Sequence, residues 1–207
     1  MKEYITIKGE NTAHYEEKHS RFIAAAYHCE SEKQAAEIIA NVKSKYWDAR
    51  HNVYAFVLSD GTARFSDDGE PHGTAGKPIL DVIKGSEIVD VLVVVTRYFG
   101  GILLGTGGLV RAYSSSAKDA LETARRVQMC QCSEYSIVCD YSAHARLVSL
   151  IEDCGGNIEN TEFTDSVKIN FVLKTDAADN FENKLREIFS SKITADLQKN
   201  SLFPFNI

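Results

Sequence analysis

The sequence has no long apolar run and no cysteine pattern typical of a disulfide-linked protein. None of its apolar stretches approaches the roughly 20 residues that a membrane-spanning helix needs, and the first ten residues lack the apolar core of a signal peptide. Five cysteines are an odd number, which fits reduced thiols in a reducing compartment better than a set of disulfides. We therefore expect a cytoplasmic protein that does not bind a membrane.

The sequence also lacks the motifs of common catalytic and metal sites. It holds neither the Gly-Lys-Ser/Thr string of a phosphate-binding loop nor the Gly-x-Gly-x-x-Gly of a dinucleotide site. No serine or cysteine stands in a Gly-x-Ser-x-Gly or comparable nucleophile context. Cys130 and Cys132 have no second close pair to complete a zinc site, so we interpret them as small buried residues on one face of a strand. These absences predict no catalytic residue, no metal and no cofactor.

Positive charge is not in excess either. The net charge is −6; residues 1–132 carry 16 basic and 17 acidic residues, and residues 133–207 carry 7 and 12. Neither part is a polycation, which argues against diffuse, non-specific binding to nucleic acid. A local basic groove remains compatible with this balance.

What the sequence does contain is a clear succession of extended and helical patterns. In the first part, strands are expected at 3–8, 20–28, 53–58 and 89–96, and helices at 31–45, 74–84 and 107–124. No charge interrupts the apolar run 91–95, which is typical of a strand buried on both faces.

The apolar pattern changes between residues 125 and 133. Beyond it the order of elements is strand, helix, strand, strand, helix, strand, which is the ferredoxin-like βαββαβ arrangement. We therefore predict an α+β protein of two domains, residues 1–130 and 133–207, that fold separately and are joined near 128–133.

Eight of the 13 glycines lie in two turns that flank the buried strand: Gly69, Gly73, Gly76, Gly100, Gly101, Gly105, Gly107 and Gly108. Gly107 and Gly108 begin a long predicted helix, whose free N–H groups and positive dipole end favour an anion. Arg97 at the end of the buried strand and Arg111 one turn into this helix are then placed to hold a phosphate together. The alternative is that these glycines only let strand and helix pack closely.

Three acidic residues and one histidine form a cluster in the first glycine turn: Asp67, Asp68, Glu70 and His72. Together with His51 they predict a polar cleft, interpreted either as a divalent-metal or acid–base site or as a turn whose carboxylates cap backbone N–H groups and a helix start. Because both glycine turns adjoin strand ends of one sheet, we expect the following residues to lie in a single cleft: Asp67, Glu70, Thr74, Arg97 and Arg111.

Several strings in the first part resemble the YigZ/Impact family. They are SRFI at 20–23, ARH at 49–51, DDGEP at 67–71, GTAGKP at 73–78, VVTRYFGG at 94–101 and LGTGGLVRAY at 104–113. One position departs from the family pattern, since Leu103 stands where a lysine is common. This change removes a positive charge beside the predicted anion site.

The resemblance implies an N-terminal Impact-type domain with a βαβ fold similar to domain IV of elongation factor G, and a C-terminal domain similar to its domain V. It also implies a link to translation, because eukaryotic members regulate initiation, whereas some bacterial members carry a peptidase label.

Our first hypothesis is a non-enzymatic, translation-associated regulator that binds RNA or the ribosome through the glycine-rich cleft. The residues expected to contact RNA or an anion are Thr74, Lys77, Arg97, Phe99, Gly100, Gly101, Gly107, Gly108 and Arg111. Phe99 is included because an aromatic ring beside basic residues can stack on a base. The alternatives are a small hydrolase or metalloenzyme that uses the acidic cluster, and a regulator that binds a protein of the translation machinery.

Overall fold

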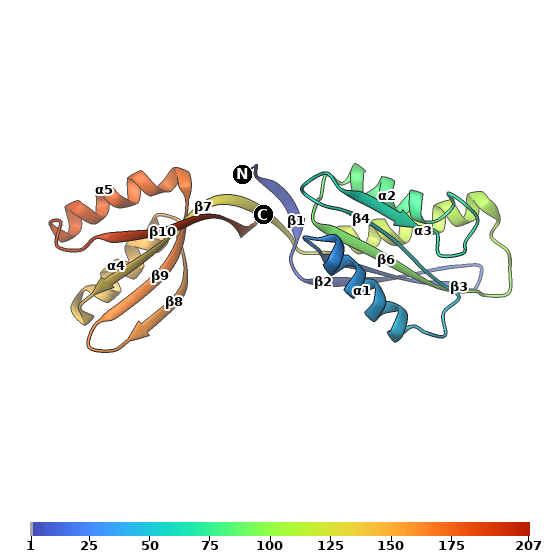
Figure 1. The fold of residues 1–207 in the computed structure, drawn as a ribbon, viewed down its shortest axis with the longest axis horizontal. Helices are drawn as coiled ribbons and strands as arrows, with labels where there is room; N and C mark the ends of the chain where they lie inside the picture. The colour runs from blue at the N-terminus through green and yellow to red at the C-terminus, as the bar shows by residue number, and fades with distance from the viewer. Residues whose placement is uncertain (1) are drawn as a thin grey trace. The chain divides into compact units, whose positions relative to one another are not determined.

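The computed structural model describes residues 2–207, which divide into two compact units. The N-terminal domain comprises Tyr4–Val127 with Asn206–Ile207, and the C-terminal domain comprises residues 2–3 with Gln128–Phe205 (Figure 1). Each contains both helices and strands. The predicted α+β fold of two domains is confirmed.

The N-terminal domain is built on a five-stranded antiparallel sheet. Its strands, in spatial order, are β2 (Glu10–Glu17), β3 (Ser20–His28), β6 (Val91–Tyr98), β4 (His51–Val57) and β5 (Ala63–Ser66). Strand β1 (Tyr4–Ile7) precedes them, and the helices are α1 (Glu32–Lys45), α2 (Gly76–Gly85) and α3 (Gly105–Glu122). Helix α1 packs on one face of the sheet, and helices α2 and α3 pack on the other.

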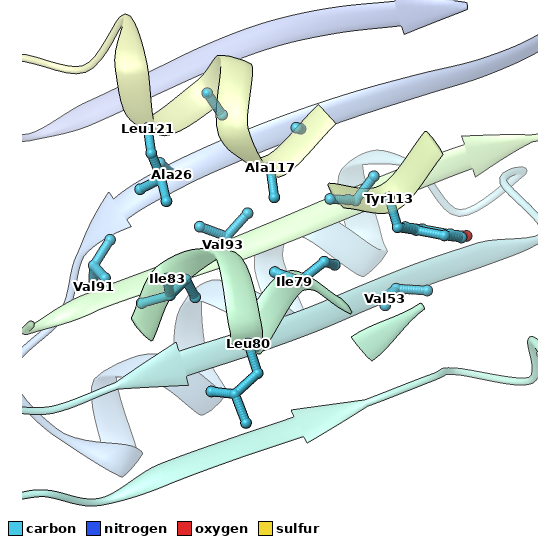
Figure 2. Close-up of a cluster of buried hydrophobic side chains, with 14 of the residues drawn as sticks. Ala26, Val53, Ile79, Leu80, Ile83, Val91, Val93, Tyr113, Ala117 and Leu121 are labelled. Atoms are coloured by element: carbon cyan, nitrogen blue, oxygen red, sulfur yellow. The ribbon is translucent and has the colours of Figure 1, made fainter. Parts of the chain in front are cut away.

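Strand β6 lies at the centre of this sheet and is buried on both faces. Val91, Val93 and Val95 pack with α2 and α3, as Figure 2 shows for the first two, whereas Leu92 and Val94 pack against α1. The period of two continues to Arg97, which therefore points toward the face covered by α2 and α3. The charged side chain of Arg97 therefore follows Val91, Val93 and Val95 along the same face of strand β6.

The C-terminal domain has the predicted βαββαβ order. Its elements are β7 (Arg126–Cys139), α4 (Tyr141–Asp153), β8 (Asn157–Phe163), β9 (Val167–Lys174), a 3-10 turn (Thr175–Ala177), α5 (Ala178–Phe189) and β10 (Ala195–Asn206). Strand β10 pairs with β7, β7 with β9, and β9 with β8. Both helices contribute to one core, in which Phe171 and Phe181 are completely buried.

The residues near which we expected the two domains to join, 128–133, belong to strand β7. Cys130 and Cys132 in this stretch are buried with Val172, against Phe203 and Phe205 of β10. Burial on the C-terminal sheet therefore keeps residues 128–133 extended and paired. The same packing bears out the interpretation of the two cysteines as small buried residues.

Two strands of the N-terminal sheet were not anticipated. Strand β2 reads Glu-Asn-Thr-Ala-His-Tyr-Glu-Glu, and none of its residues is fully buried. It nevertheless pairs along its whole length with β3. An edge strand of this kind has too little apolar content to be found from its hydrophobic pattern. The other is β5, which has only four residues.

No helix in residues 2–207 combines the length and the apolar content that crossing a membrane requires.

Gly100 marks the closest approach between two backbones near the predicted cleft. A Cβ atom placed there would lie 2.0 Å from the carbonyl carbon of His19 and 2.4 Å from the nitrogen of Ser20. The Gly100 N–H donates to the Ser20 hydroxyl at 3.3 Å. Only a residue without a side chain fits this contact.

We predict that Gly100→Ala destabilises the N-terminal domain by about 1–3 kcal/mol, because the added methyl group overlaps backbone atoms that cannot move aside. Gly107→Ala is the matched control: it lies in α3 with no atom within 4 Å of an added Cβ. The control should gain about 0.5–1 kcal/mol from helix propensity. Urea unfolding of both variants measures the difference, and equal midpoints would contradict it.

Candidate functional site

The site is organised around Arg97 near the end of strand β6. The strand register places Arg97 opposite Phe22 of β3 on one side and His51 of β4 on the other. Arg97 is only 5% exposed. A buried guanidinium requires a nearby negative charge and hydrogen-bond acceptors.

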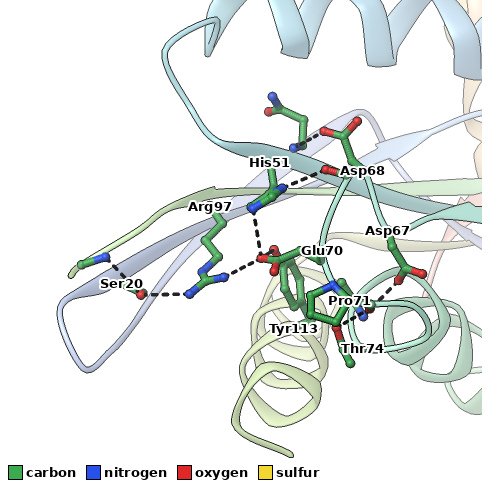
Figure 3. Close-up of polar contacts among 12 residues, drawn as sticks. Ser20, His51, Asp67, Asp68, Glu70, Pro71, Thr74, Arg97 and Tyr113 are labelled. Carbon is green, nitrogen blue, oxygen red and sulfur yellow. Dashed lines mark hydrogen bonds and ion pairs between the residues drawn. The ribbon is translucent and has the colours of Figure 1, made fainter. Parts of the chain in front are cut away.

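Glu70 supplies that negative charge. Its Oε1 accepts a hydrogen bond from Nη1 of Arg97 at 2.6 Å and another from the Tyr113 hydroxyl at 2.8 Å (Figure 3). Nε2 of His51 lies 3.8 Å from the same oxygen. Because Glu70 is 9% exposed, this is a buried ion pair that joins β6, the loop before α2, and helix α3.

The loop reaches this position through two left-handed residues. Asp68 has a φ of 44° and Gly69 a φ of 86°, and the N–H of Glu70 donates to the carbonyl of Asp67 at 3.0 Å. The turn brings the Asp68 carbonyl within 2.8 Å of Nδ1 of His51, so that this ring nitrogen donates to it. The turn therefore positions both Glu70 and the histidine next to it.

The remaining contacts of Arg97 are a hydroxyl and two aromatic rings. Nη2 donates to Oγ of Ser20 at 3.3 Å, and the guanidinium carbon lies 5.5 Å from the ring centre of Phe22 and 5.7 Å from that of Phe99. Cations are attracted to the faces of aromatic rings at such distances. The Nε of Arg97 is buried and has no hydrogen-bond partner within residues 2–207.

The other members of the acidic cluster have structural roles. Asp67 accepts hydrogen bonds from the N–H groups of Gly73, Ala75 and Gly76, at 2.8–3.2 Å, and so caps helix α2. Asp68 binds Lys43 of α1 and the N–H of Asn52.

His72 has a fully exposed side chain, 3.8 Å from Asp67. The contacts of Asp67 and Asp68 fit the interpretation of this turn as one whose carboxylates accept hydrogen bonds from backbone N–H groups. Within residues 2–207, no group of three or more His, Cys, Asp or Glu side chains is arranged to hold a metal ion.

A cleft of about 410 Å³ opens beside the ion pair. Its lining residues are Arg50, His51, Gly69, Glu70, Pro71, Arg97, Phe99, Leu103, Leu104, Gly105, Thr106 and Leu109. Gly105 and Thr106 form the first turn of α3, and Leu104 before them offers no side chain to cap it. The free N–H groups of this turn, with the positive end of the helix dipole, therefore lie at the edge of the cleft.

The cleft contains some of the predicted residues and excludes others. Of the five expected to share one cleft, Glu70 and Arg97 line it, whereas Asp67, Thr74 and Arg111 are not among its lining residues. His51 and Phe99 also line it.

The other predicted residues lie around the cleft or on neighbouring surfaces. The buried Thr74 donates its hydroxyl to the carbonyl of Pro71 at 2.7 Å. Lys77 pairs with Asp81 and lines a separate hollow with Gly73. Arg111 is exposed on α3. Gly107 and Gly108 lie in the first turn of this helix, which begins at Gly105, two residues before the predicted start at 107.

Three contributors were not found from the sequence. Arg50 and Thr106 are ordinary polar residues whose place in the cleft depends on the fold. Tyr113 reads as part of the apolar face of α3, although its hydroxyl binds Glu70. A tyrosine at a core position is itself a signal, because a buried phenol needs a hydrogen-bond partner.

We predict that Glu70→Gln destabilises the N-terminal domain by about 3–5 kcal/mol, because it leaves the Arg97 charge buried without a counterion. Glu122→Gln is the matched control, since Glu122 forms an exposed pair with Lys118 at 3.6 Å. Its loss should cost no more than about 1 kcal/mol. Chemical unfolding of both variants at neutral pH tests this, and a cost for Glu70→Gln similar to that of the control would refute it.

We also predict a change in alkaline stability for Tyr113→Phe. Burial raises the pKa of Tyr113 above its ordinary value of 10.0, and the charge and hydrogen bond of Glu70 raise it further. Above pH 10 the unfolded tyrosine ionises while the folded one stays neutral, so its contribution to stability is lost as pH rises. Tyr113→Phe should lack this part of the fall in unfolding free energy, which approaches about 1.4 kcal/mol per pH unit above pH 10. Unfolding free energies at pH 9–11 measure the slope; an unchanged slope would contradict the assignment.

With this geometry established, the chain can be compared with known proteins. The Impact N-terminal domain matches residues 18–121, and a domain of unknown function, DUF1949, matches residues 137–192. The IMPACT family member YigZ of Escherichia coli (strain K12) is 37% identical over 174 residues, which cover 82% of this chain and 85% of that protein.

An IMPACT family member of Haemophilus influenzae is 34% identical over 95% of this chain and 98% of its own length. The chain is also similar to a crystal structure of a hypothetical protein, with a TM-score of 0.62 and 32% identity over 96% of this chain and 98% of that chain. These matches confirm the resemblance carried by the glycine-rich strings. The chain belongs to the IMPACT family, with an Impact N-terminal domain followed by DUF1949.

Proposed function

We propose that this protein is a non-enzymatic regulator that binds RNA or the ribosome through the cleft of the N-terminal domain and adjusts translation. The observation that carries the proposal is the meeting of three features in one cleft: the uncapped first turn of α3, the exposed cation of Arg50 and the half-exposed ring of Phe99. Helix N-termini and arginines bind phosphate, and aromatic rings stack on bases.

The charge of the cleft supports an anionic ligand. Its lining residues include two arginines and one glutamate, and Glu70 already neutralises Arg97. Arg50 makes no ion pair with any residue in 2–207, so its charge is available to a ligand. The first turn of α3 adds partial positive charge at the same place.

The chemistry of the cleft favours binding over hydrolysis. Neither serine nor cysteine occurs among its lining residues, and Nδ1 of His51 is already bonded to the carbonyl of Asp68. Glu70 is held by Arg97 and Tyr113, and the Thr106 hydroxyl, which also lines the cleft, makes no hydrogen bond to Glu70 or His51. The link to translation rests on the family resemblance.

The test is binding of the full chain to ribosomal subunits and to single-stranded RNA across a salt series. Arg50→Ala should weaken binding to all sequences alike and lower the salt slope by about one phosphate contact. Phe99→Ala should cost roughly 1–3 kcal/mol and leave the slope nearly unchanged. Lys192→Ala, which removes the same charge from the C-terminal domain, is the control.

Binding that neither cleft variant weakens, with both variants folded, would refute the proposal and favour a protein partner. Turnover of a dipeptide or phosphoester by the wild type, abolished by a Glu70→Gln variant that is shown to be folded under the assay conditions but not by Phe99→Ala, would instead favour the hydrolase.

A further inference from the structure

We infer that Trp47, in the turn that follows helix α1, is a second stacking platform for single-stranded RNA, beside the cleft. The inference rests on the proposed function, because it extends the path of the same strand beyond Phe99. A strand bound in this way presents bases to two rings, one in the turn after α1 and one in the loop after β6.

Trp47 is unusual in how much of its side chain faces solvent. It is the only tryptophan of the chain, and it is 83% exposed. A tryptophan ring contributes a large apolar area, and folded proteins bury most of that area on average. Because the packing of the domain makes so little use of this ring, its faces are open to a ligand.

The turn that carries Trp47 is attached to the edge of the cleft. Tyr98, the residue before Phe99, donates its hydroxyl to Asp48 at 2.8 Å. Arg50 lines the cleft. Trp47 and Arg50 are three residues apart, so the backbone between them spans at most about 11 Å. A strand that leaves the cleft past Arg50 therefore reaches Trp47 within roughly three stacked nucleotides at about 3.4 Å each.

The charge around Trp47 is complementary to a nucleic-acid backbone. Residues 43–51 contain three basic residues and one acidic residue, although the net charge of the chain is −6. The acidic residue, Asp48, already accepts the Tyr98 hydroxyl. Lys45 and Arg50 are exposed, and neither forms an ion pair within residues 2–207. Two cations on either side of the ring in sequence are therefore available to phosphates.

These surroundings favour RNA over a protein segment. The centre of a protein interface is depleted of charged residues, whereas Trp47 is flanked by the exposed Lys45, Asp48 and Arg50. Sites for single strands combine cations that follow the backbone with aromatic rings on which bases stack. Trp47 and Phe99, with Lys45 and Arg50, have this composition. Since stacking accepts every base, we expect little sequence preference.

The first experiment uses Trp47 as its own reporter, because the chain has no other tryptophan. The full chain is titrated with octauridylate, with octaadenylate and with inorganic polyphosphate, which carries backbone-like charge without bases. Both RNAs should quench the tryptophan fluorescence at similar concentrations, because a stacked base quenches an indole ring. Polyphosphate should leave the fluorescence unchanged, since it brings no base to the ring.

Matched variants of exposed aromatic residues measure the contribution to affinity. Trp47→Leu keeps an apolar side chain but removes the ring. It should weaken binding of labelled octauridylate at least about fivefold, the lower end of what loss of one stacked base costs, with the salt dependence unchanged. Trp47→Phe should recover most of the affinity. Phe163→Leu, which changes a 57% exposed ring of the C-terminal domain, should bind like the wild type.

Three results would overturn the inference. They are octauridylate that leaves the Trp47 fluorescence unchanged, equal affinities of Trp47→Leu and Phe163→Leu for RNA, and binding of ribosomal subunits that depends on Trp47 when binding of octauridylate does not. The last would favour a protein partner at this turn.

The same measurements separate the inference from the proposed function. If Trp47 is silent while Arg50→Ala and Phe99→Ala weaken RNA binding, the inference fails and the proposed function stands. If RNA quenches Trp47 and Trp47→Leu weakens binding, but neither cleft variant does, the Trp47 site stands and the proposed use of the cleft fails.

Discussion

The buried ion pair between Arg97 and Glu70 is the constraint on which the rest of the N-terminal domain depends. An uncompensated charge at either position would cost several kcal/mol, so each residue is tolerated only while the other is in place. The loop that carries Glu70 therefore has one acceptable position against strand β6. Tyr113 binds the same carboxylate oxygen from α3, at 2.8 Å, so that sheet, loop and helix are fixed at a single point.

The cleft is a consequence of the same contacts. The Arg97 guanidinium lies against Phe99, and Ser20 accepts hydrogen bonds from both Arg97 and the N–H of Gly100. The turn that leads from β6 to α3 is therefore attached to the ion pair at its start. Because that turn determines where the first turn of α3 begins, the buried charges also set the position of the free N–H groups.

Local patterns predicted much of the fold and little of the site's electrostatics. The apolar run of β6 and the βαββαβ order were predictable because burial imposes periods that are visible within a few residues. Strand β2 was not, because pairing along β3 holds it in place and only Ala13 and Tyr15 of its residues are apolar and packed on the core. The sequence marked Arg97 and Glu70 as polar residues beside glycine turns, but 27 positions separate them. That their charges cancel depends on tertiary packing, and so does the place of Arg50 in the cleft.

The two arginines of the cleft consequently have different functions despite their shared charge. Arg97 is neutralised within the protein, and its chief effect is on stability and on the position of Phe99. Arg50 is exposed and lies outside the buried cluster, so its charge contributes to the potential that an approaching anion encounters. Leu103 also lines the cleft and is largely exposed. A change of charge at the exposed Arg50 therefore leaves the buried pair undisturbed, whereas the pair itself cannot change one residue at a time.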